Sequence, residues 1–407
     1  MQELKQRIQS KKAVVAVIGL GYVGLPLAHE IKKAGFEVIG IDIKKIKDKI
    51  IKTTTSYDEL KKADIIIICL PTPLTKHKEP DMRYIKAGLR EIKKRLQKDQ
   101  LIILESTTYP GTTEELLLPK LESAGLKVGK DFYLGYSPER IDPGNKKFNI
   151  KNTAKLVSGA TKNCTNLTKL FYEQFIDQVV PVSSPRSAEM AKLLENIFRI
   201  VNISMINELA MLCGKMDIDI WEVIEAAKTK PFGFMPFYPG PGVGGHCIGV
   251  DPFYLSWKAK EYGFFTRFIE LSGEINELMP HYVVTKIIWA LNNQKKPIKN
   301  SKILVFGVSY KKDIGDIRES PAIKIIWDLA RKGAKISYHD PHVPEIKINN
   351  KKYKSIKLTS QIFKNTDCLL ILTDHSGYDY EDLAKKAKLV IDTKNIVKAK
   401  LRNVYKL

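Results

Sequence analysis

The chain has 407 residues, of which 44% are hydrophobic and 28% are charged. These fractions are ordinary for a soluble globular protein of two or three domains, and they exclude a disordered, collagenous or disulfide-knot protein. Lys and Arg number 67 against 45 Asp and Glu, which gives a formal net charge of +22 at pH 7. Such a surface either favours anionic partners (nucleic acid, an acidic membrane or a phosphorylated small molecule) or is simply a lysine-rich solubilising surface.

The five cysteines lie far apart and form no CxxC pair. This spacing predicts neither a disulfide framework nor a metal site, and it favours a reducing cytoplasm. The polar N-terminus lacks the apolar core of a signal peptide. The longest uncharged stretch, residues 231–250, holds six Gly and four Pro, so no membrane span is expected.

Strands and helices alternate over the first part of the chain. Short apolar runs rich in β-branched residues predict buried parallel strands, and the amphipathic stretches between them predict helices. The alternation indicates βαβ units, and therefore an α/β fold with a Rossmann-like N-terminal domain over residues 1–186. The expected strands are residues 13–20, 37–42, 63–70 and 101–106, and the expected helices are 22–34, 85–96 and 113–124.

A long helical pattern follows from Ser187 to about Met216, and its length suggests a connector or a subunit interface. With further helices it predicts a central helical, dimerisation domain over residues 187–293. After a polar linker the alternation restarts and predicts a smaller Rossmann-like domain over residues 300–407. The expected helices here are 220–228, 252–261, 272–292 and 320–332, and the expected strands are 301–310, 334–340, 367–373 and 388–392.

The first glycine-rich turn has the pattern G-x-G-x-x-G between a strand and a helix. In such a turn the first glycine permits the bend, the second lets a pyrophosphate approach the backbone, and the third allows close helix packing. Asp42 ends the next strand, where its carboxylate can accept from both ribose hydroxyls and repel a 2′-phosphate. An NAD site is therefore predicted at Gly19, Gly21, Tyr22, Val23, Gly24 and Asp42.

Hydroxyl side chains follow two further predicted strands, in residues 71–73 and 106–108. Ligands bind at the carboxyl ends of parallel strands, so Thr72 and Thr107 are candidate cofactor contacts or water-positioning groups. Spacing alone leaves the alternative that these residues are helix N-caps.

The glycine-rich loop at residues 239–253 is the most unusual stretch of the chain. Its glycines, Gly244 and Gly245 among them, let the backbone wrap closely around a ligand. Asp251 followed by proline predicts a helix start, which would place Cys247 in a loop where a thiolate is stabilised. The alternative is an inert buried cysteine.

On the long helix, Glu189, Lys192, Asn196 and Arg199 share one polar face. Lys192 and Asn196 can hydrogen-bond an oxyanion or a water beside a ligand. The alternative is a stripe of solvated side chains.

Six segments, in order along nearly the whole chain, match a known family. They are GLGYVGLPLA, ESTTYPGTTEELL, GYSPERIDPGN, KLLENIFRIVNISMINELA, PGPGVGGHCIGVDPFYL and YKKDIGDIRESPA. The chain resembles the UDP-glucose/GDP-mannose dehydrogenase family. Within this family it is most similar to the branch acting on UDP-N-acetylhexosamines, and especially to UDP-N-acetylglucosamine 6-dehydrogenase. The resemblance implies oxidation of the sugar C6 alcohol to a carboxylate in two hydride transfers, with two NAD and one water.

The resemblance also implies roles for residues of the site. Cys247 matches the nucleophile that adds to the C6 aldehyde as a thiohemiacetal and, after the second hydride leaves, holds a thioester for water to hydrolyse. Lys192 matches the lysine that stabilises developing oxyanions, and Asn196 matches its partner on the same helix face. Asp251 matches the acid that helps to activate the thiol or the water.

Thr107 and Glu139 match the residues that position the hydrolytic water, with Glu139 a candidate general base. Lys311 resembles the lysine that bridges to the nucleotide sugar, and Arg318 resembles the arginine that reaches the NAD pyrophosphate.

The sequence departs from members acting on UDP-glucose, because Val250 stands where they commonly have a lysine. The PERIDPGN segment also differs from theirs, and Arg140 within it is a possible new substrate contact. The expected substrate contacts are Glu139, Arg140, Lys192, Asn196, Gly244, Gly245 and Lys311.

The favoured function is therefore NAD-dependent oxidation of a UDP-N-acetylhexosamine, with UDP-N-acetylglucosamine as the first choice, for surface polysaccharide synthesis. The alternatives are the same chemistry on UDP-N-acetylgalactosamine, UDP-N-acetylmannosamine or UDP-glucose, and a catalytically silent nucleotide-binding protein. A cytoplasmic homodimer or larger homo-oligomer is expected, with neither nucleic acid nor a membrane as partner.

Overall fold

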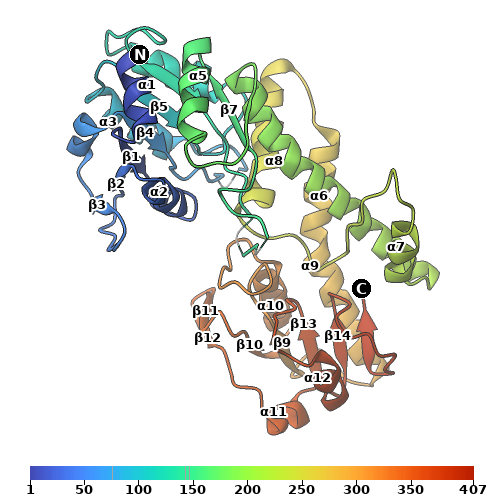
Figure 1. Cartoon of the computed structure of the whole chain (residues 1–407). Helices are drawn as coiled ribbons and strands as arrows, with labels where there is room; N and C mark the ends of the chain where they lie inside the picture. Colours follow the sequence, from blue (N-terminus) through green and yellow to red (C-terminus); the bar gives the residue numbers. More distant parts are fainter. Residues whose placement is uncertain (76, 143, 146) are drawn as a thin grey trace. The chain divides into compact units, whose positions relative to one another are not determined.

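The fold comes from a computed structural model that describes the chain except residues 76, 143 and 146 and the side chains of residues 246–248. The chain forms two compact units (Figure 1). The first unit comprises residues 1–195 and 250–265, and the second unit comprises residues 196–249 and 266–407. The expected division into three domains stays a prediction.

An eight-stranded sheet forms the centre of the first unit. Its order is β3-β2-β1-β4-β5-β6-β7-β8, and neighbouring strands are parallel except β6 and β7. The order reverses between β1 and β4, and ligands bind at such switch points outside the carboxyl ends of the strands. The strands are β1 (Val14–Ile18), β2 (Glu37–Ile41), β3 (Lys52–Thr54), β4 (Ile65–Ile68), β5 (Leu101–Leu104), β6 (Tyr133–Tyr136), β7 (Lys155–Gly159) and β8 (Val179–Pro181).

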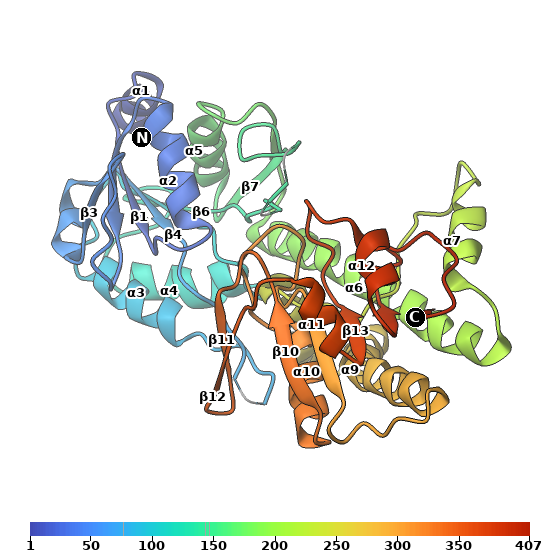
Figure 2. The ribbon, with the colours of Figure 1, turned by 90° about the horizontal axis from the view of Figure 1, so that it is seen from below.

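Helices cover both faces of this sheet, which explains why its central strands β1, β4 and β5 are apolar throughout. Figure 2 shows α2 and α5 on one side of the strands and α3 and α4 on the other. On the first side, α1, α2 and α5 bury their apolar faces in one continuous core with the strands. The helices are α1 (Gln2–Gln9), α2 (Gly24–Lys33), α3 (Arg83–Lys93), α4 (Leu118–Glu122) and α5 (Lys162–Tyr172), with a 3-10 helix at Tyr57–Lys62 and a π-helical turn at Thr112–Leu117.

The second unit contains a five-stranded parallel sheet in the order β10-β9-β13-β14-β15. Helices α9 and α10 pack on one face, and α11 and α12 pack on the other. Its strands are β9 (Lys302–Phe306), β10 (Lys335–His339), β13 (Cys368–Ile371), β14 (Val390–Asp392) and β15 (Val404–Lys406), with a separate hairpin of β11 (Glu345–Ile348) and β12 (Lys351–Lys354). Its helices are α7 (Ile220–Lys228), α9 (Arg267–Asn293), α10 (Pro321–Arg331), α11 (Ser360–Asn365) and α12 (Tyr380–Lys386).

Two helices have residues in both units: α6 (Pro185–Met216) and α8 (His246–Ala259), which a 3-10 turn at Lys260–Tyr262 follows. The α/β class and the two Rossmann-like sheets confirm the predicted fold. The expected helix start at Asp251 is wrong, because α8 begins at His246 and contains Cys247, Asp251 and Pro252. Gly245, at φ +88°, ends the loop earlier. Pro252 therefore lies inside α8, where its missing N–H removes one hydrogen bond of the helix.

No membrane span was expected, and α6 is the helix, within the part of the chain described, whose length and apolarity alone would allow one. Those properties are weak evidence for a span, because the core helix of a soluble protein shares them. This helix also carries the buried polar side chains of Glu189, Lys192 and Asn196.

Candidate active site

The glycine-rich turn between β1 and α2 has the geometry that a dinucleotide requires. A Cβ added to Gly19 would lie 2.5 Å from the Cys69 carbonyl oxygen, and one added to Gly24 would lie 1.9 Å from the Gly19 oxygen. Close packing therefore requires these two glycines. A Cβ added to Gly21 would meet no atom within 4 Å, so the missing side chain leaves space over the turn where a pyrophosphate fits.

Asp42 follows β2 at the same edge of the sheet. Its Oδ2 accepts from the Leu20 N–H at 2.9 Å, and its Oδ1 accepts from the Lys44 N–H at 2.9 Å. Each oxygen has a further lone pair, so the fixed carboxylate can accept from ribose hydroxyls. Tyr22 is 66% exposed beside the turn. These residues fit NAD.

Replacing Asp42 with asparagine should weaken NAD binding by about 10- to 100-fold, because a hydrogen bond to a charged group contributes roughly 1.5–3 kcal/mol. The preference over NADP should fall as well, since the repulsion of a 2′-phosphate is lost. Titrating both cofactors against the wild type and Asp42→Asn checks this. An unchanged NAD affinity would contradict the assignment of Asp42.

Polar groups gather where β5 and β6 end. Ser106 donates to the Leu70 carbonyl at 2.7 Å, and Thr72 is 5% exposed. The helix N-cap alternative is wrong for residues 106–108, because the next helical turn begins at Thr112; residues 71–73 likewise precede no helix before α3. The Thr108 Oγ1 and Tyr136 hydroxyl oxygens are buried and have no hydrogen-bond partner among the residues that the structure describes. Thr107 is half-buried beside them, and such orphaned polar atoms are expected beside a ligand site.

Two buried charged residues at this edge were missed by the sequence analysis: Glu105, directly after β5, and Lys155, the first residue of β7. Burial, together with the nearby Glu139 carboxylate, raises the pKa of Glu105 to about 7. The pKa of the Tyr136 hydroxyl is raised by burial and by carboxylates that include Glu189 and Asp251. A charged residue adjoining an apolar parallel strand is the signal that could have revealed Glu105 and Lys155.

The polar face of α6 is buried where it begins. Glu189 is 0% exposed, Lys192 is 7% and Asn196 is 5%, whereas Arg199 is exposed. A solvated stripe is therefore the wrong interpretation for the first three. Within the described part of the chain, no hydrogen bond or ion pair is found for the Lys192 ammonium, although burying an unpaired charge is costly.

Glu189 fixes the start of the turn after β5. Its Oε2 accepts from the Gly111 N–H at 2.6 Å, and its Oε1 accepts from the Thr113 N–H at 2.9 Å and the Thr113 hydroxyl at 2.7 Å. Burial nevertheless raises its pKa to about 7. Glu189, which the sequence places on the same polar face as Lys192 and Asn196, thus holds the protein's own backbone.

The raised pKa makes a prediction about stability. A carboxyl whose pKa is about 4.5 unfolded and about 7 folded stabilises the fold fully below pH 4.5, and that contribution, about 3 kcal/mol, is lost as the pH rises through 7. Glu189→Gln cannot titrate, so its free energy of unfolding should fall less between pH 5 and 8 than that of the wild type. Urea denaturation at both pH values measures this. Equal falls would contradict the raised pKa of Glu189.

The glycine-rich loop is packed against the second unit's own chain. A Cβ on Gly244 would lie 2.6 Å from the Glu319 carbonyl oxygen, and one on Gly245 would lie 2.8 Å from the Tyr310 ring. The Gly245 N–H also donates to the Arg318 carbonyl at 3.0 Å. Here the glycines allow close backbone packing instead of the ligand wrapping expected from the sequence, and their role as substrate contacts stays a prediction.

The side chain of Cys247 lies outside the described residues, so its role stays a prediction. Asp251, four residues later on α8, is 2% exposed and has interaction partners in the structure. Val250 before it is also buried.

Glu139 and Arg140 follow β6 in the first unit. Glu139 is 11% exposed in its side chain. Arg140 has two partners, the Ala154 carbonyl at 2.7 Å from Nη1 and the Glu195 carboxylate at 2.7 Å from Nη2. Arg140 therefore ties this segment to α6 and to the start of β7.

Lys311 and Arg318 lie in the second unit after β9. Arg318 forms a two-pronged ion pair with Asp316, with its Nη2 2.7 Å from Oδ2 and its Nε 3.1 Å from Oδ1, yet its side chain is 45% exposed. Lys311 is half-buried and its carbonyl accepts from the Ser309 hydroxyl at 3.0 Å. A guanidinium held in this way presents its remaining N–H groups in a fixed direction.

Three possible metal-ligand groups meet nearby, on Asp313, His342 and His375, with ligand atoms within 4.8 Å of one another. His375 Nδ1 accepts from the Asp313 N–H at 3.0 Å, and its Nε2 lies 3.1 Å from Asp340 Oδ2. Both ring nitrogens are thus engaged, and the cluster is a hydrogen-bond network that holds the loops after β9 and β13.

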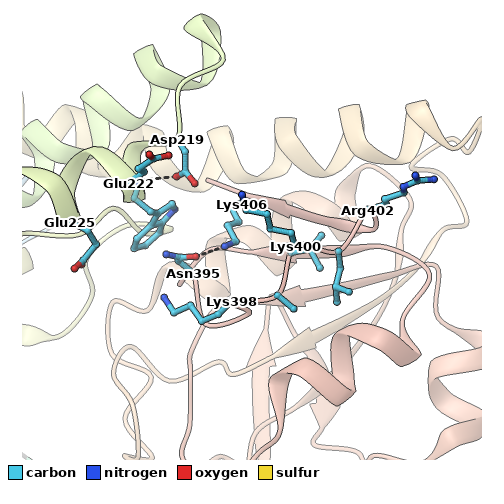
Figure 3. Close-up of a pocket in the computed structure, with 12 residues that line it drawn as sticks. Asp219, Glu222, Glu225, Asn395, Lys398, Lys400, Arg402 and Lys406 are labelled. Atoms are coloured by element: carbon cyan, nitrogen blue, oxygen red, sulfur yellow. Dashed lines mark hydrogen bonds between the residues drawn. The ribbon is translucent and has the colours of Figure 1, made fainter.

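A cavity of about 580 Å³ lies in the second unit between α7 and residues 395–406 (Figure 3). None of the sequence-predicted site residues is among the described residues that line it. Acidic side chains line the α7 side and basic ones the opposite side: Asp219, Glu222 and Glu225 against Lys398, Lys400, Arg402 and Lys406.

Comparison with known proteins agrees with this architecture. Three domain models of one family match: the NAD binding domain at residues 13–52 and 44–176, the central domain at 186–278 and the UDP binding domain at 304–399. Protein CapL of Staphylococcus aureus is 37% identical over 96% of this chain and 97% of its own length. UDP-N-acetyl-D-glucosamine 6-dehydrogenase of Pseudomonas aeruginosa is 37% identical over 82% of this chain and 84% of its own.

Among solved structures, the UDP-D-ManNAc dehydrogenase of Pyrococcus horikoshii superimposes with a TM-score of 0.86 at 30% identity, covering 97% of this chain and 98% of that one. The three matched domains span most of the chain in order. The chain belongs to the UDP-glucose/GDP-mannose dehydrogenase family and is an NAD-dependent oxidoreductase of UDP-sugars.

Proposed function

We propose that this enzyme oxidises the C6 hydroxyl of UDP-N-acetylglucosamine to the carboxylate in four electrons. The alcohol, two NAD⁺ and one water give the uronate, two NADH and three protons. Bound NAD supplies the acceptor for each hydride. The residues assigned to the site then act as the nucleophile, as stabilisers of the oxyanion and as groups that activate water.

Cys247 attacks the C6 aldehyde, so that a C–S bond forms and the carbonyl oxygen becomes an alkoxide. The Lys192 ammonium and the Asn196 amide stabilise that developing negative charge. Asp251 takes part in the proton transfers of the thiol. Water, positioned by Thr107 and Glu139, then breaks the C–S bond of the thioester.

The buried ammonium of Lys192 is the observation that supports this proposal most strongly. Lys192 is only 7% exposed. A buried charge is expected to be paired, and no partner for this one is found among the described residues. An anionic reaction centre would supply the missing partner. The alternative of a catalytically silent nucleotide-binding protein has no support, since such a protein has no reason to keep this unpaired charge.

The choice of the N-acetylglucosamine sugar draws on the Pseudomonas aeruginosa relative, at 37% identity. UDP-N-acetylmannosamine is the second candidate, because the Pyrococcus horikoshii structure is so similar. UDP-N-acetylgalactosamine and UDP-glucose follow, the latter disfavoured by Val250. NADH release with each purified UDP-sugar tests the choice, and a clear preference for UDP-glucose would overturn it.

We also propose a cytoplasmic homodimer, with a second copy covering one face of α6. The proposal is supported by exposed apolar side chains that recur along this helix at helical spacing. They are Met190, Leu194, Phe198, Met205, Leu209, Leu212 and Met216, each between 39% and 58% exposed. The uronate that this enzyme forms would serve surface polysaccharide synthesis.

The oligomer is tested by sedimentation velocity, which should give a dimer for the wild type at micromolar concentration. Leu209→Glu places a charge on the exposed face and should shift the population to monomer. The matched change Lys215→Glu, on the same helix and outside the apolar stripe, should leave the dimer intact. A wild-type monomer would contradict the proposal.

A further inference from the structure

An ion pair, with both of its side chains buried, lies at the edge of the first unit's sheet where the parallel strands end. Glu105 Oε2 lies 2.8 Å from Nζ of Lys155. The Tyr172 hydroxyl, at the end of α5, donates to Glu105 Oε1 at 2.5 Å. Because β7 runs antiparallel to β6, its first residue reaches the edge where the parallel strands end. The exposed fractions of the two charged side chains are 0% and 5%.

The same ammonium reaches Glu139, whose Oε2 is 3.4 Å away. Oε1 of Glu139 accepts from the backbone N–H groups of Arg140 and Ile141, each at 2.6 Å. Both carboxylate oxygens therefore have donors from fixed positions. Glu139, the residue that the proposed function assigns to water activation, is thus held by the buried Lys155. Lys155 is held in turn by the buried Glu105.

We propose that Lys155, held by Glu105, is a positioning residue that keeps Glu139 ionised and oriented while the Cys247 thioester is hydrolysed. This inference rests on the proposed function. In that step the water oxygen bonds to the acyl carbon, the C–S bond breaks and its electron pair goes to sulfur. The proton that water loses moves to the Glu139 carboxylate and from there to solvent.

Electrostatics explains why the lysine is needed. Without it, Glu105 and Glu139 would be two neighbouring carboxylates in a buried site, and like charges raise each other's pKa. Burial lowers the pKa of Lys155, but the two glutamates raise it further, so that it lies above its ordinary value. Of the other titratable groups at the cluster, Tyr172 and Cys69 have their pKa values raised by burial, so both are neutral at pH 7, and Arg140 is cationic.

The chain offers a matched control. Lys258, on α8, is also a buried lysine that joins two glutamates, with Nζ 2.7 Å from Glu115 Oε2 and 2.6 Å from Glu261 Oε2. Its side chain is 6% exposed. The Glu115 and Glu261 side chains are 37% and 50% exposed, so the match lies in the lysine itself. Replacing either lysine with methionine removes a buried ammonium that joins two glutamates, and a general effect of that loss would appear in both variants.

The test compares full-length wild type, K155M, K155R, E105Q and K258M with UDP-N-acetylglucosamine and NAD. Stopped-flow absorbance follows the NADH burst and the steady rate from pH 5 to 9. Intact-mass spectrometry of enzyme quenched during turnover gives the fraction that carries an acyl group. Circular dichroism confirms that each variant is folded.

We expect K155M to release NADH in a burst and then turn over about 100-fold more slowly, with acyl-enzyme accumulating. The acid limb of its rate profile should move to higher pH by about one unit, because without the ammonium two neighbouring carboxylates share the buried site and their charged forms are disfavoured. K155R should restore most of the rate. E105Q should show the same changes, with turnover about 10-fold slower than in the wild type. This variant therefore tests the positioning role if K155M fails to fold.

A folded K155M, or E105Q in its place, with an unmoved acid limb and no acyl-enzyme would overturn the positioning role. An equal loss in K258M would overturn it too. If the wild type oxidises no UDP-sugar, the proposed function itself fails, which is seen before any variant is compared.

Discussion

Cys247→Ala should abolish uronate formation while NAD still binds. Without the sulfur neither the thiohemiacetal nor the thioester forms, so turnover should fall by at least about 10⁴-fold, as for the loss of other covalent nucleophiles. NADH release with UDP-N-acetylglucosamine measures turnover, and calorimetric titration with NAD measures binding. Unchanged NAD affinity would show that the loss is chemical.

The matched control is Cys213→Ala, which removes a free, half-buried thiol on α6. It should leave turnover within about twofold of the wild type, because the substitution of a half-buried residue away from the site changes the stability and the activity little. Substantial turnover in Cys247→Ala would remove the nucleophile assignment. A comparable loss in Cys213→Ala would mean that the assay reports damage to the fold.

Lys192→Met should have opposite effects on activity and stability. Turnover should fall by about 10²- to 10³-fold, because a donor aimed at the developing oxyanion is lost. The free energy of unfolding should rise by about 1–2 kcal/mol, because a buried charge without a partner destabilises the folded state. Steady-state kinetics and urea denaturation, measured on the same preparation, check both.

The contrast with Lys258→Met makes this result specific. That lysine has two carboxylate partners, and its removal breaks both ion pairs, although Glu115 keeps Arg186 as a partner. The variant should therefore lose stability. If Lys192→Met loses stability in the same way, its ammonium is paired within the protein, and the strongest support for the proposed chemistry is lost.

Much of the fold was predictable because strands buried on both faces are recognisable without their partners. The runs of residues 65–68 and 101–104 are wholly apolar, and they became β4 and β5. β6 was missed because it contains Gly135, whose place depends on tertiary packing: an added Cβ would lie 2.2 Å from the Thr168 hydroxyl oxygen of α5. β8, with three residues, exists only through its pairing with β7.

For the site, local spacing was informative and long-range contact was not. Gly19, Gly24 and Asp42 could be placed because their roles depend on a strand, a turn and a helix in immediate succession. The start of α8 could not, because Gly245 ends the loop through packing on Tyr310. The bond between Glu105 and Lys155 joins residues 50 apart in the sequence, and only the antiparallel direction of β7 brings them together.

In the proposed mechanism the sugar becomes covalently attached to Cys247 during oxidation. The most direct measurement is peptide mass spectrometry of enzyme quenched within the first turnover on UDP-N-acetylglucosamine and NAD. We expect an acyl group from the oxidised sugar on the peptide that contains Cys247, formed with two NADH per site and removed by hydroxylamine. Two NADH released with that peptide unmodified at every quench time would contradict it.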